Sequence, residues 1–209
     1  MSKAELVTFA IAMLAITNPI GNLAIFASLT ANKSPKEKKK TAFVAGLAIT
    51  IIMILVTWTG GLLLHAFGID IASFETAGGV IIALMGISML QAKTSEIHHT
   101  KDEHEEAKTK DSVAVVPIAI PIVAGPGAIT TIIVNTHKYG TFEDKGLISI
   151  VCLGIAALLW LAFFFSAPVS RVLGQSGINI VTRIMGIVLT AIAFGMLTDG
   201  LKILLPGLS

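Results

Sequence analysis

Apolar and polar positions along this chain gather in long blocks. Six apolar blocks are separated by short polar stretches, at residues 4–30, 41–66, 69–91, 113–136, 147–169 and 178–204. Each block has roughly the 20 residues that an α-helix needs to cross a hydrocarbon core about 30 Å thick. Because the blocks are continuous and lack a period of two, they predict transmembrane helices and exclude a β-barrel.

Proline and glycine interrupt the first and the fourth block. The first interruption is Asn18-Pro19-Ile20-Gly21-Asn22, and the second is Gly125-Pro126-Gly127, which follows Pro117 and Pro121. Proline lacks a backbone N–H and clashes with the preceding turn, and the residue before it is pushed out of helical angles. We therefore expect two half-helices in each block. The alternative is a pair of proline kinks with a purely structural role, which are common in membrane helices.

Similar features recur at a nearly constant spacing. Pro19 and Pro126 are 107 positions apart, and residues 68–71 (Gly-Ile-Asp-Ile) resemble residues 177–180 (Gly-Ile-Asn-Ile). This spacing predicts two homologous halves, residues 1–91 and 113–209, joined by a polar linker at 92–112. Since each half has three spans, the second half runs the opposite way through the bilayer. The predicted fold is an all-α membrane protein with six transmembrane helices in two inverted-topology three-helix repeats, and the first helix of each repeat is broken.

Composition and charge agree with a membrane protein and orient it. The chain is 54% hydrophobic and 13% charged, whereas soluble domains carry about 25% charged residues. Lysine and arginine concentrate in the loops after the first, third and fifth blocks, with five lysines at 33–40 alone. Basic loops stay in the cytoplasm, so both termini are predicted to be extracytoplasmic.

The linker and the single cysteine bear on whether the protein binds metal or carries electrons. His98, His99 and His104 lie in the linker among carboxylates, and two interpretations follow: a metal-sensing loop, or a solvated connection of mixed charge. We expect the connection, with no metal site and no cofactor. Cys152 stands alone, so a dithiol electron carrier is disfavoured. No nucleophile and base occur in a catalytic pattern, and no partner nucleic acid is expected.

The two interruptions are the predicted binding site. The N-terminus of a half-helix exposes unpaired N–H groups and a positive partial charge, and inverted repeats bring two such ends together. This arrangement suits a small carboxylate-bearing solute. The predicted substrate-binding residues are Asn18, Pro19, Gly21, Asn22, Gly125, Pro126, Gly127, Thr130 and Thr131.

Two charged residues lie within the blocks. Glu75 is in the third block and Arg183 in the sixth. Intramembrane charges usually face the interior of a bundle, so both are candidates for coupling or gating, and Glu75 could carry a coupling proton. The alternative for both is a side chain that reaches back to its own membrane surface. A direct pair requires both side chains to reach the midplane.

The residues resemble those of a known family. The motif Thr17-Asn18-Pro19-Ile20-Gly21-Asn22, the run 117–130 with its Gly-Pro-Gly, Ala77-Gly78-Gly79 and Arg183-Ile184-Met185-Gly186 are similar to the MarC family of bacterial and archaeal inner-membrane proteins, grouped with LysE-type exporters. The resemblance covers nearly the whole chain and implies two inverted helix triplets and transport of small neutral amino acids such as alanine and glycine. It departs at Glu75, where the family pattern has a basic residue equivalent to Arg183.

These observations predict a secondary transporter in the inner membrane for small neutral amino acids or similar zwitterions. The alternatives are an ion channel or metal-ion exporter that uses the linker, or a non-transporting accessory subunit. A coupling ion (proton or sodium) and a homo-oligomer are open questions at this stage.

Overall fold

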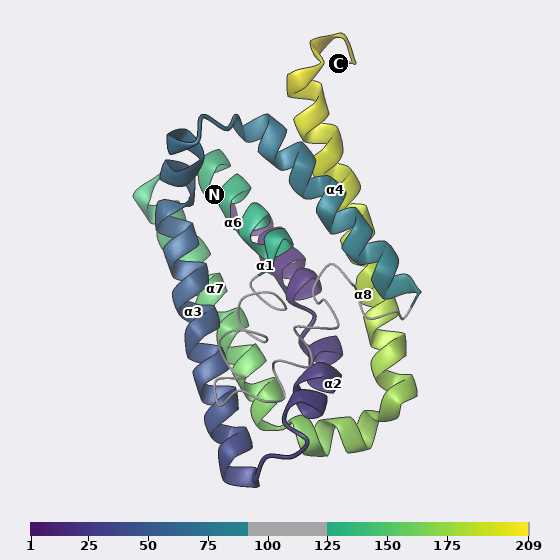
Figure 1. The fold of residues 1–209 in the computed structure, drawn as a ribbon. Helices are drawn as coiled ribbons and strands as arrows, with labels where there is room; N and C mark the ends of the chain where they lie inside the picture. Colours follow the sequence, from purple (N-terminus) through teal and green to yellow (C-terminus); the bar gives the residue numbers. More distant parts are fainter. Residues whose placement is uncertain (92–124, 209) are drawn as a thin grey trace.

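The computed structural model describes residues 1–91 and 125–208, and these residues form helices without a strand among them. The helices are α1 (Lys3–Thr17), α2 (Pro19–Leu29), α3 (Pro35–Ala66), α4 (Ile71–Leu90), α6 (Pro126–Lys138), α7 (Phe142–Phe164), α8 (Ser166–Leu204) and the short η2 (Pro206–Leu208) (Figure 1). The predicted linker at 92–112 lies outside the described residues, and so do Pro117 and Pro121.

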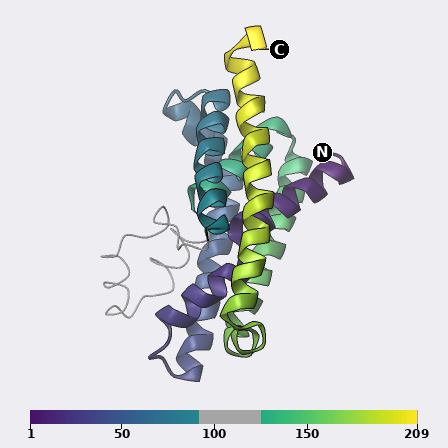
Figure 2. The same ribbon diagram turned by 90° about the vertical axis from the view of Figure 1, so that its right-hand side faces the viewer.

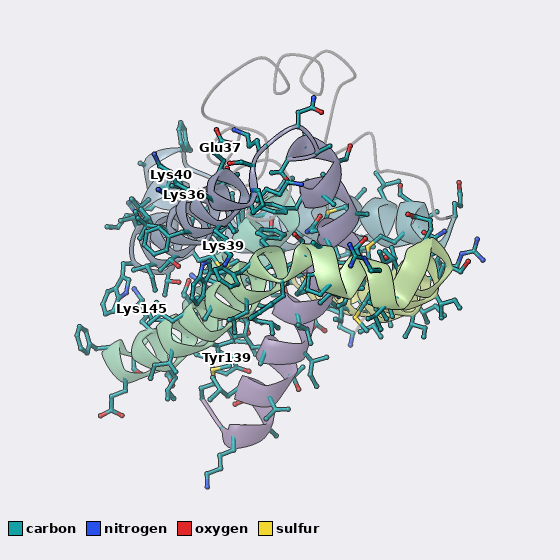
Figure 3. The ribbon with its side chains drawn as sticks, turned by 90° about the horizontal axis from the view of Figure 1, so that it is seen from below. Lys36, Glu37, Lys39, Lys40, Tyr139 and Lys145 are labelled. Carbon is teal, nitrogen blue, oxygen red and sulfur yellow. The ribbon has the colours of Figure 1, made fainter. Side chains whose placement is uncertain are left out.

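The helices run between two ends of the molecule. The upper end in Figure 1 carries both chain termini and the links from α3 to α4 and from α6 to α7, and we call it the terminal end. The opposite end carries Lys33 and the lysines of residues 36–40, and we call it the lysine end. Figure 3, which looks onto the lysine end, shows Lys36, Lys39 and Lys40 gathered at the start of α3. The Lys39 ammonium lies 4.7 Å from the centroid of the Phe164 ring, within cation–π range.

Five helical stretches are long and apolar enough to cross a bilayer: α1 with α2, then α3, α4, α7 and α8. They match five of the six predicted blocks. The fourth block, 113–136, is described only in its second part, which lies in α6. Large apolar side chains are exposed along one stripe of α3, including Phe43, Leu47, Ile51 and Leu55. A stripe of this kind is suited to lipid contact.

The polar first turns of two helices lie outside the apolar blocks. α3 begins at Pro35 rather than at residue 41, because Ser34 and Glu37 form a capping box in which Glu37 accepts from the Ser34 N–H at 2.8 Å. α7 begins at Phe142 rather than at residue 147, and Thr141 caps it by accepting from the Asp144 N–H at 3.1 Å. Prediction from hydropathy therefore placed both starts too late.

The last two predicted blocks differ from the structure near residue 165. α7 ends at Phe164, not at residue 169, and α8 begins at Ser166, not at residue 178. Gly174 has φ 60° and ψ 176°, a backbone conformation that glycine adopts readily. Residues 166–173 cross the lysine end, and the remainder of α8 then rises to the terminal end (Figure 1). The apolar pattern of the sequence did not predict this turn at Gly174.

α4 and α8 lie side by side and run in opposite directions (Figures 1 and 2). Glycines let their backbones touch. A Cβ atom on Gly79 would lie 3.0 Å from the carbonyl oxygen of Ala193 and 2.9 Å from the backbone nitrogen of Leu197. The first distance is tighter than most real Cβ contacts and the second is shorter than real Cβ contacts allow, so close packing of these two helices favours glycine at this position.

Gly186 repeats this contact from the other helix. A Cβ atom on Gly186 would lie 2.9 Å from the carbonyl oxygen of Gly86 and 3.1 Å from the backbone nitrogen of Leu90. Gly186 follows Gly79 by 107 positions, and its two partners precede the partners of Gly79 by the same 107 positions. The contact between α4 and α8 is therefore reciprocal at the spacing that separates Pro19 from Pro126.

Candidate functional site

The first span is broken at Asn18, as the sequence predicts. Asn18 has φ 36° and ψ 68°, in the left-handed region, where it ends α1 and begins α2. Its N–H donates to the Leu14 carbonyl at 3.0 Å, and its Oδ1 accepts from the Gly21 N–H at 3.1 Å. Asparagine tolerates this conformation better than most residues and is a strong helix N-cap. One residue thus closes the first half-helix and starts the second.

Asn22 repairs the hydrogen bonding that the break disturbs. In an unbroken helix the Gly21 N–H would donate to the Thr17 carbonyl, but here it donates to Asn18. The Asn22 Nδ2 donates to that Thr17 carbonyl instead, at 2.7 Å. Gly21 is required beside them, because a Cβ atom there would overlap the Asn18 amide. One polar atom of each asparagine side chain, Asn18 Oδ1 and Asn22 Nδ2, therefore bonds to the backbone of the break. The other polar atom of each side chain is the one that a ligand could contact.

Asn18 carries our first prediction. Asn18→Gly should keep the left-handed backbone and lose only the cap, whereas Asn18→Ala should lose the cap and also strain the backbone. The expected cost for alanine is about 2 kcal/mol, from a left-handed residue (about 1 kcal/mol) and a lost cap (about 1 kcal/mol). Thermal unfolding in detergent should rank wild type above glycine and glycine above alanine. Equal stability of the two variants would contradict the left-handed break.

The second predicted break lies at the start of α6, where the described residues resume. Gly125 is extended, with φ −66° and ψ 178°, and supplies no side-chain cap, and Pro126 is the first helical residue. Gly125 and Gly127 are buried, while Pro126 is exposed. The first N–H groups of α6 therefore start in the protein interior, and within residues 1–91 and 125–208 no side-chain cap accepts from them. Such a helix start favours an anionic group.

The two breaks adjoin each other. A Cβ atom on Gly127 would lie 3.4 Å from Ile16 Cγ2, two residues before Asn18. On its other side it would lie 3.2 Å from Ile82 Cγ1 and 3.2 Å from Met85 Sδ, both on α4. The start of α6 thus faces the end of α1, and α4 covers both. Thr130 packs against Gly78 of α4 by its side chain.

Thr131 has a buried hydroxyl without a partner. Its side chain is 2% exposed, and its Oγ1 makes no hydrogen bond to the described residues. The buried residues Thr17, Thr30 and Thr57 each donate to the carbonyl four residues earlier, at 2.7–2.8 Å. For Thr131 that carbonyl would be that of Gly127, one turn back toward the helix start. An unpaired buried hydroxyl costs about 1–3 kcal/mol, so Thr131 differs from the other buried threonines in this respect.

Glu75 and Arg183 do not form a pair. Arg183 is exposed, and Glu75 is half-buried on α4 within electrostatic range of Lys138 and Asp199. Its cationic neighbour among the described residues is thus Lys138, at the end of α6. The hydrogen bond with the Tyr139 hydroxyl raises the pKa of Lys138 above its usual value. The sequence alone could not predict that Lys138 lies near Glu75, since α6 and α4 are distant in sequence.

Thr182 was not among the predicted site residues but lies at the first break. A Cβ atom on Gly21 would lie 3.0 Å from Thr182 Oγ1, which places this hydroxyl of α8 beside the start of α2. A hollow of about 480 Å³ also opens here, and Asn18, Pro19 and Ile20 line it together with apolar residues of α7 and α8. No sequence motif marks Thr182, because threonines are frequent in these spans.

Comparison with known proteins identifies relatives over most of the chain. The family model described as MarC family integral membrane protein matches residues 4–205. The UPF0056 membrane protein YhcE of Escherichia coli is 36% identical over 208 residues, covering 96% of this chain and 93% of that protein. YvbG of Bacillus subtilis is 36% identical over 202 residues, with 95% of each chain covered. A UPF0056 membrane protein of Archaeoglobus fulgidus is 36% identical over 186 residues, with 89% and 87% covered. No solved structure matches.

Proposed function

The chain belongs to the MarC family of integral membrane proteins, and we propose that it is a secondary transporter of small neutral amino acids, such as alanine- and glycine-like zwitterions. One observation carries the proposal: the unpartnered Thr131 hydroxyl lies one turn inside the uncapped start of α6, where the two breaks adjoin. A substrate at this place would satisfy the polar groups that the fold leaves open. The family match supports a multi-pass membrane protein and does not itself name a substrate.

The charges of a zwitterion suit the two facing helix ends. The start of α6 directs N–H groups and a positive partial charge at the site, which favours a carboxylate. The end of α1 directs carbonyls at it, and Pro19 cannot donate to the carbonyl of Ala15, so an oxygen is available to an ammonium group. No buried lysine or arginine is needed. The side chain of the substrate would then face the apolar side chains of Ile16, Ile82 and Met85, which lie close around Gly127 and favour a small substrate.

We also propose that the two halves are inverted repeats. The support is the reciprocal contact of Gly79 and Gly186, in which both backbone partners are shifted by the same 107 positions that separate Pro19 from Pro126. α4 and α8 would then be equivalent helices related by a two-fold axis in the membrane plane. Alternating access would move one part of the protein past the other around the breaks.

Orientation and coupling complete the proposal. The lysine end would face the cytoplasm of a bacterium or archaeon, with both termini on the outer side of the inner membrane. Glu75 remains a candidate for coupling to a proton or sodium ion, and Lys138 would be its counter-charge. Arg183 would act at the membrane surface or in gating.

The second prediction tests Thr131 directly. Thr131→Val keeps the shape of the side chain and removes the hydroxyl, so a bound substrate loses one hydrogen bond, worth about 1.4 kcal/mol. The apparent affinity for the transported amino acid should fall by about tenfold. Counterflow of radiolabelled L-alanine and glycine in proteoliposomes measures this change.

The matched control is Thr57→Val. The Thr57 hydroxyl is as deeply buried but donates to Met53 within its own helix, so its loss should affect stability alone. If both variants lose transport equally, Thr131 has only a structural role. If the wild-type protein moves none of the amino acids in reconstituted vesicles, the accessory-subunit alternative replaces the transporter.

A further inference from the structure

A second hollow lies at the terminal end, apart from the breaks. It measures about 690 Å³, within the size range of sites for small molecules. The last turns of α3, the link to α4, the end of α6 and the start of α7 surround it. We name it the terminal hollow, and its chemically important lining residues are Trp58, Gly61, His65, Asp70, His137 and Lys145.

Opposite charges line the terminal hollow without neutralising each other. The Asp70 carboxylate comes from the link between α3 and α4, and the Lys145 ammonium comes from α7. In residues 1–91 and 125–208, neither side chain forms an ion pair. The imidazole groups of His65 and His137 add hydrogen-bonding atoms on two further walls. A ligand with both a cationic and an anionic group would satisfy the two charges together.

The wall between α3 and α7 is fixed by aromatic contacts. The Trp58 Nε1 donates to the Ser149 Oγ at 3.2 Å, and the Trp58 ring meets Phe142 edge-on with centroids 5.1 Å apart. On the opposite wall, Asp70 caps α4 with Oδ2 by accepting from the Ser73 N–H at 3.0 Å. The cap restrains the carboxylate and leaves its other oxygen available. The Asp70 carboxylate is therefore held in place before any ligand arrives.

We propose that the terminal hollow is a second binding site for a zwitterionic amino acid, at which the solute is held on its way to or from the helix breaks. This inference rests on the proposed transport function, since it assigns the same class of solute to another place on the route. The Asp70 carboxylate would take the ammonium group and Lys145 the carboxylate. The hollow is larger than alanine, so water and the histidine side chains would complete the contacts.

Gly61 offers a direct test. A Cβ atom on Gly61 meets nothing within 4 Å, so a side chain can project into the hollow without disturbing the fold. The native Cys152 is fully buried, so Gly61→Cys gives one reactive thiol. We would measure the rate at which a charged maleimide labels this variant in detergent, with L-alanine, lactate or ethylamine as probes. L-alanine should slow labelling several-fold, while lactate, which lacks the ammonium, and ethylamine, which lacks the carboxylate, should not.

Three further substitutions in the Gly61→Cys background locate the effect. Asp70→Asn keeps the helix cap and removes the charge, because asparagine caps as well as aspartate. Lys145→Met keeps the aliphatic stem. Both should abolish protection by L-alanine, and Thr131→Val, at the breaks, should leave it unchanged. Unaltered melting temperatures would show that each variant is folded.

The outcomes distinguish the proposal of a second binding site from the proposal of amino acid transport. Absence of protection by L-alanine, equal protection by lactate, or loss of protection in Thr131→Val would each overturn the second site. Protection by L-alanine in a protein that moves no amino acid in vesicles would refute transport and retain the hollow as a binding site. Transport without protection would refute the hollow alone.

Discussion

Gly79→Leu is expected to separate α4 from α8 and to yield little folded protein. The backbone of α8 lies 2.9–3.0 Å from the position of a Cβ atom on Gly79, and backbone cannot move aside as a side-chain tip can. Even Gly79→Ala should cost about 1–3 kcal/mol by overpacking. In a protein of this size that corresponds to a fall in melting temperature of roughly 2–12 °C. Thermal unfolding in detergent and size-exclusion profiles measure both variants.

The control for this prediction lies on the same helix pair. A Cβ atom on Gly195 of α8 meets nothing within 4 Å, so Gly195→Ala should leave the melting temperature unchanged. Gly186→Ala should destabilise the protein as Gly79→Ala does, because its contacts are the reciprocal ones. Stable Gly79→Leu protein with a wild-type melting temperature would show that α4 and α8 do not pack closely in the membrane.

The sequence predicted what covalent geometry and hydropathy determine. Pro19 cannot donate a hydrogen bond, so the break in the first span follows from its chemistry alone, and the apolar blocks located five spans. The family was also identified from the residues, and the comparisons confirm it. The placement of this family within the LysE-type exporters stays a prediction.

The sequence could not predict what tertiary contacts determine. Asn22 was expected as a ligand group, but the structure commits its Nδ2 to the Thr17 carbonyl. The orphan hydroxyl of Thr131 is distinctive only because other buried threonines find a carbonyl in their own helix. The neighbour of Glu75 is Lys138, from a helix distant in sequence. Each of these contacts depends on how the helices fold and pack against one another, and the hydropathy of the sequence does not determine this.

The structure also favours one value for the number of residues that separates equivalent positions in the two proposed halves. Motif comparison gave offsets of 107 to 109 for different segments. Packing selects 107, since Gly79 and Gly186 contact matching backbone atoms only at that shift. At this offset Thr182 corresponds to Glu75. In the proposed repeat, the residue of α8 that lies beside the first break has a carboxylate as its counterpart on α4, and the two proposed halves would differ chemically at this position.

Gly127→Leu at the start of α6 should abolish transport, because Gly127 lies where the substrate is proposed to bind. A methyl group at Gly127 would contact only side-chain atoms of Ile16, Ile82 and Met85, at 3.2–3.4 Å, and these can shift by a few tenths of an ångström. Gly127→Ala should therefore fold and retain reduced transport. Leucine is too large for these contacts and would crowd Ile16, Ile82 and Met85, where the substrate is proposed to bind.

Counterflow of radiolabelled L-alanine in proteoliposomes should fall to the level of empty vesicles for Gly127→Leu. The melting temperature shows whether the variant is folded, and Gly154→Leu serves as the matched control, because a Cβ atom on Gly154 of α7 meets nothing within 4 Å. Folded Gly127→Leu protein with wild-type transport would place the substrate elsewhere. Loss of transport in Gly127→Leu, with protection of the terminal hollow by L-alanine retained, would instead show that the solute reaches the protein and stops before the breaks.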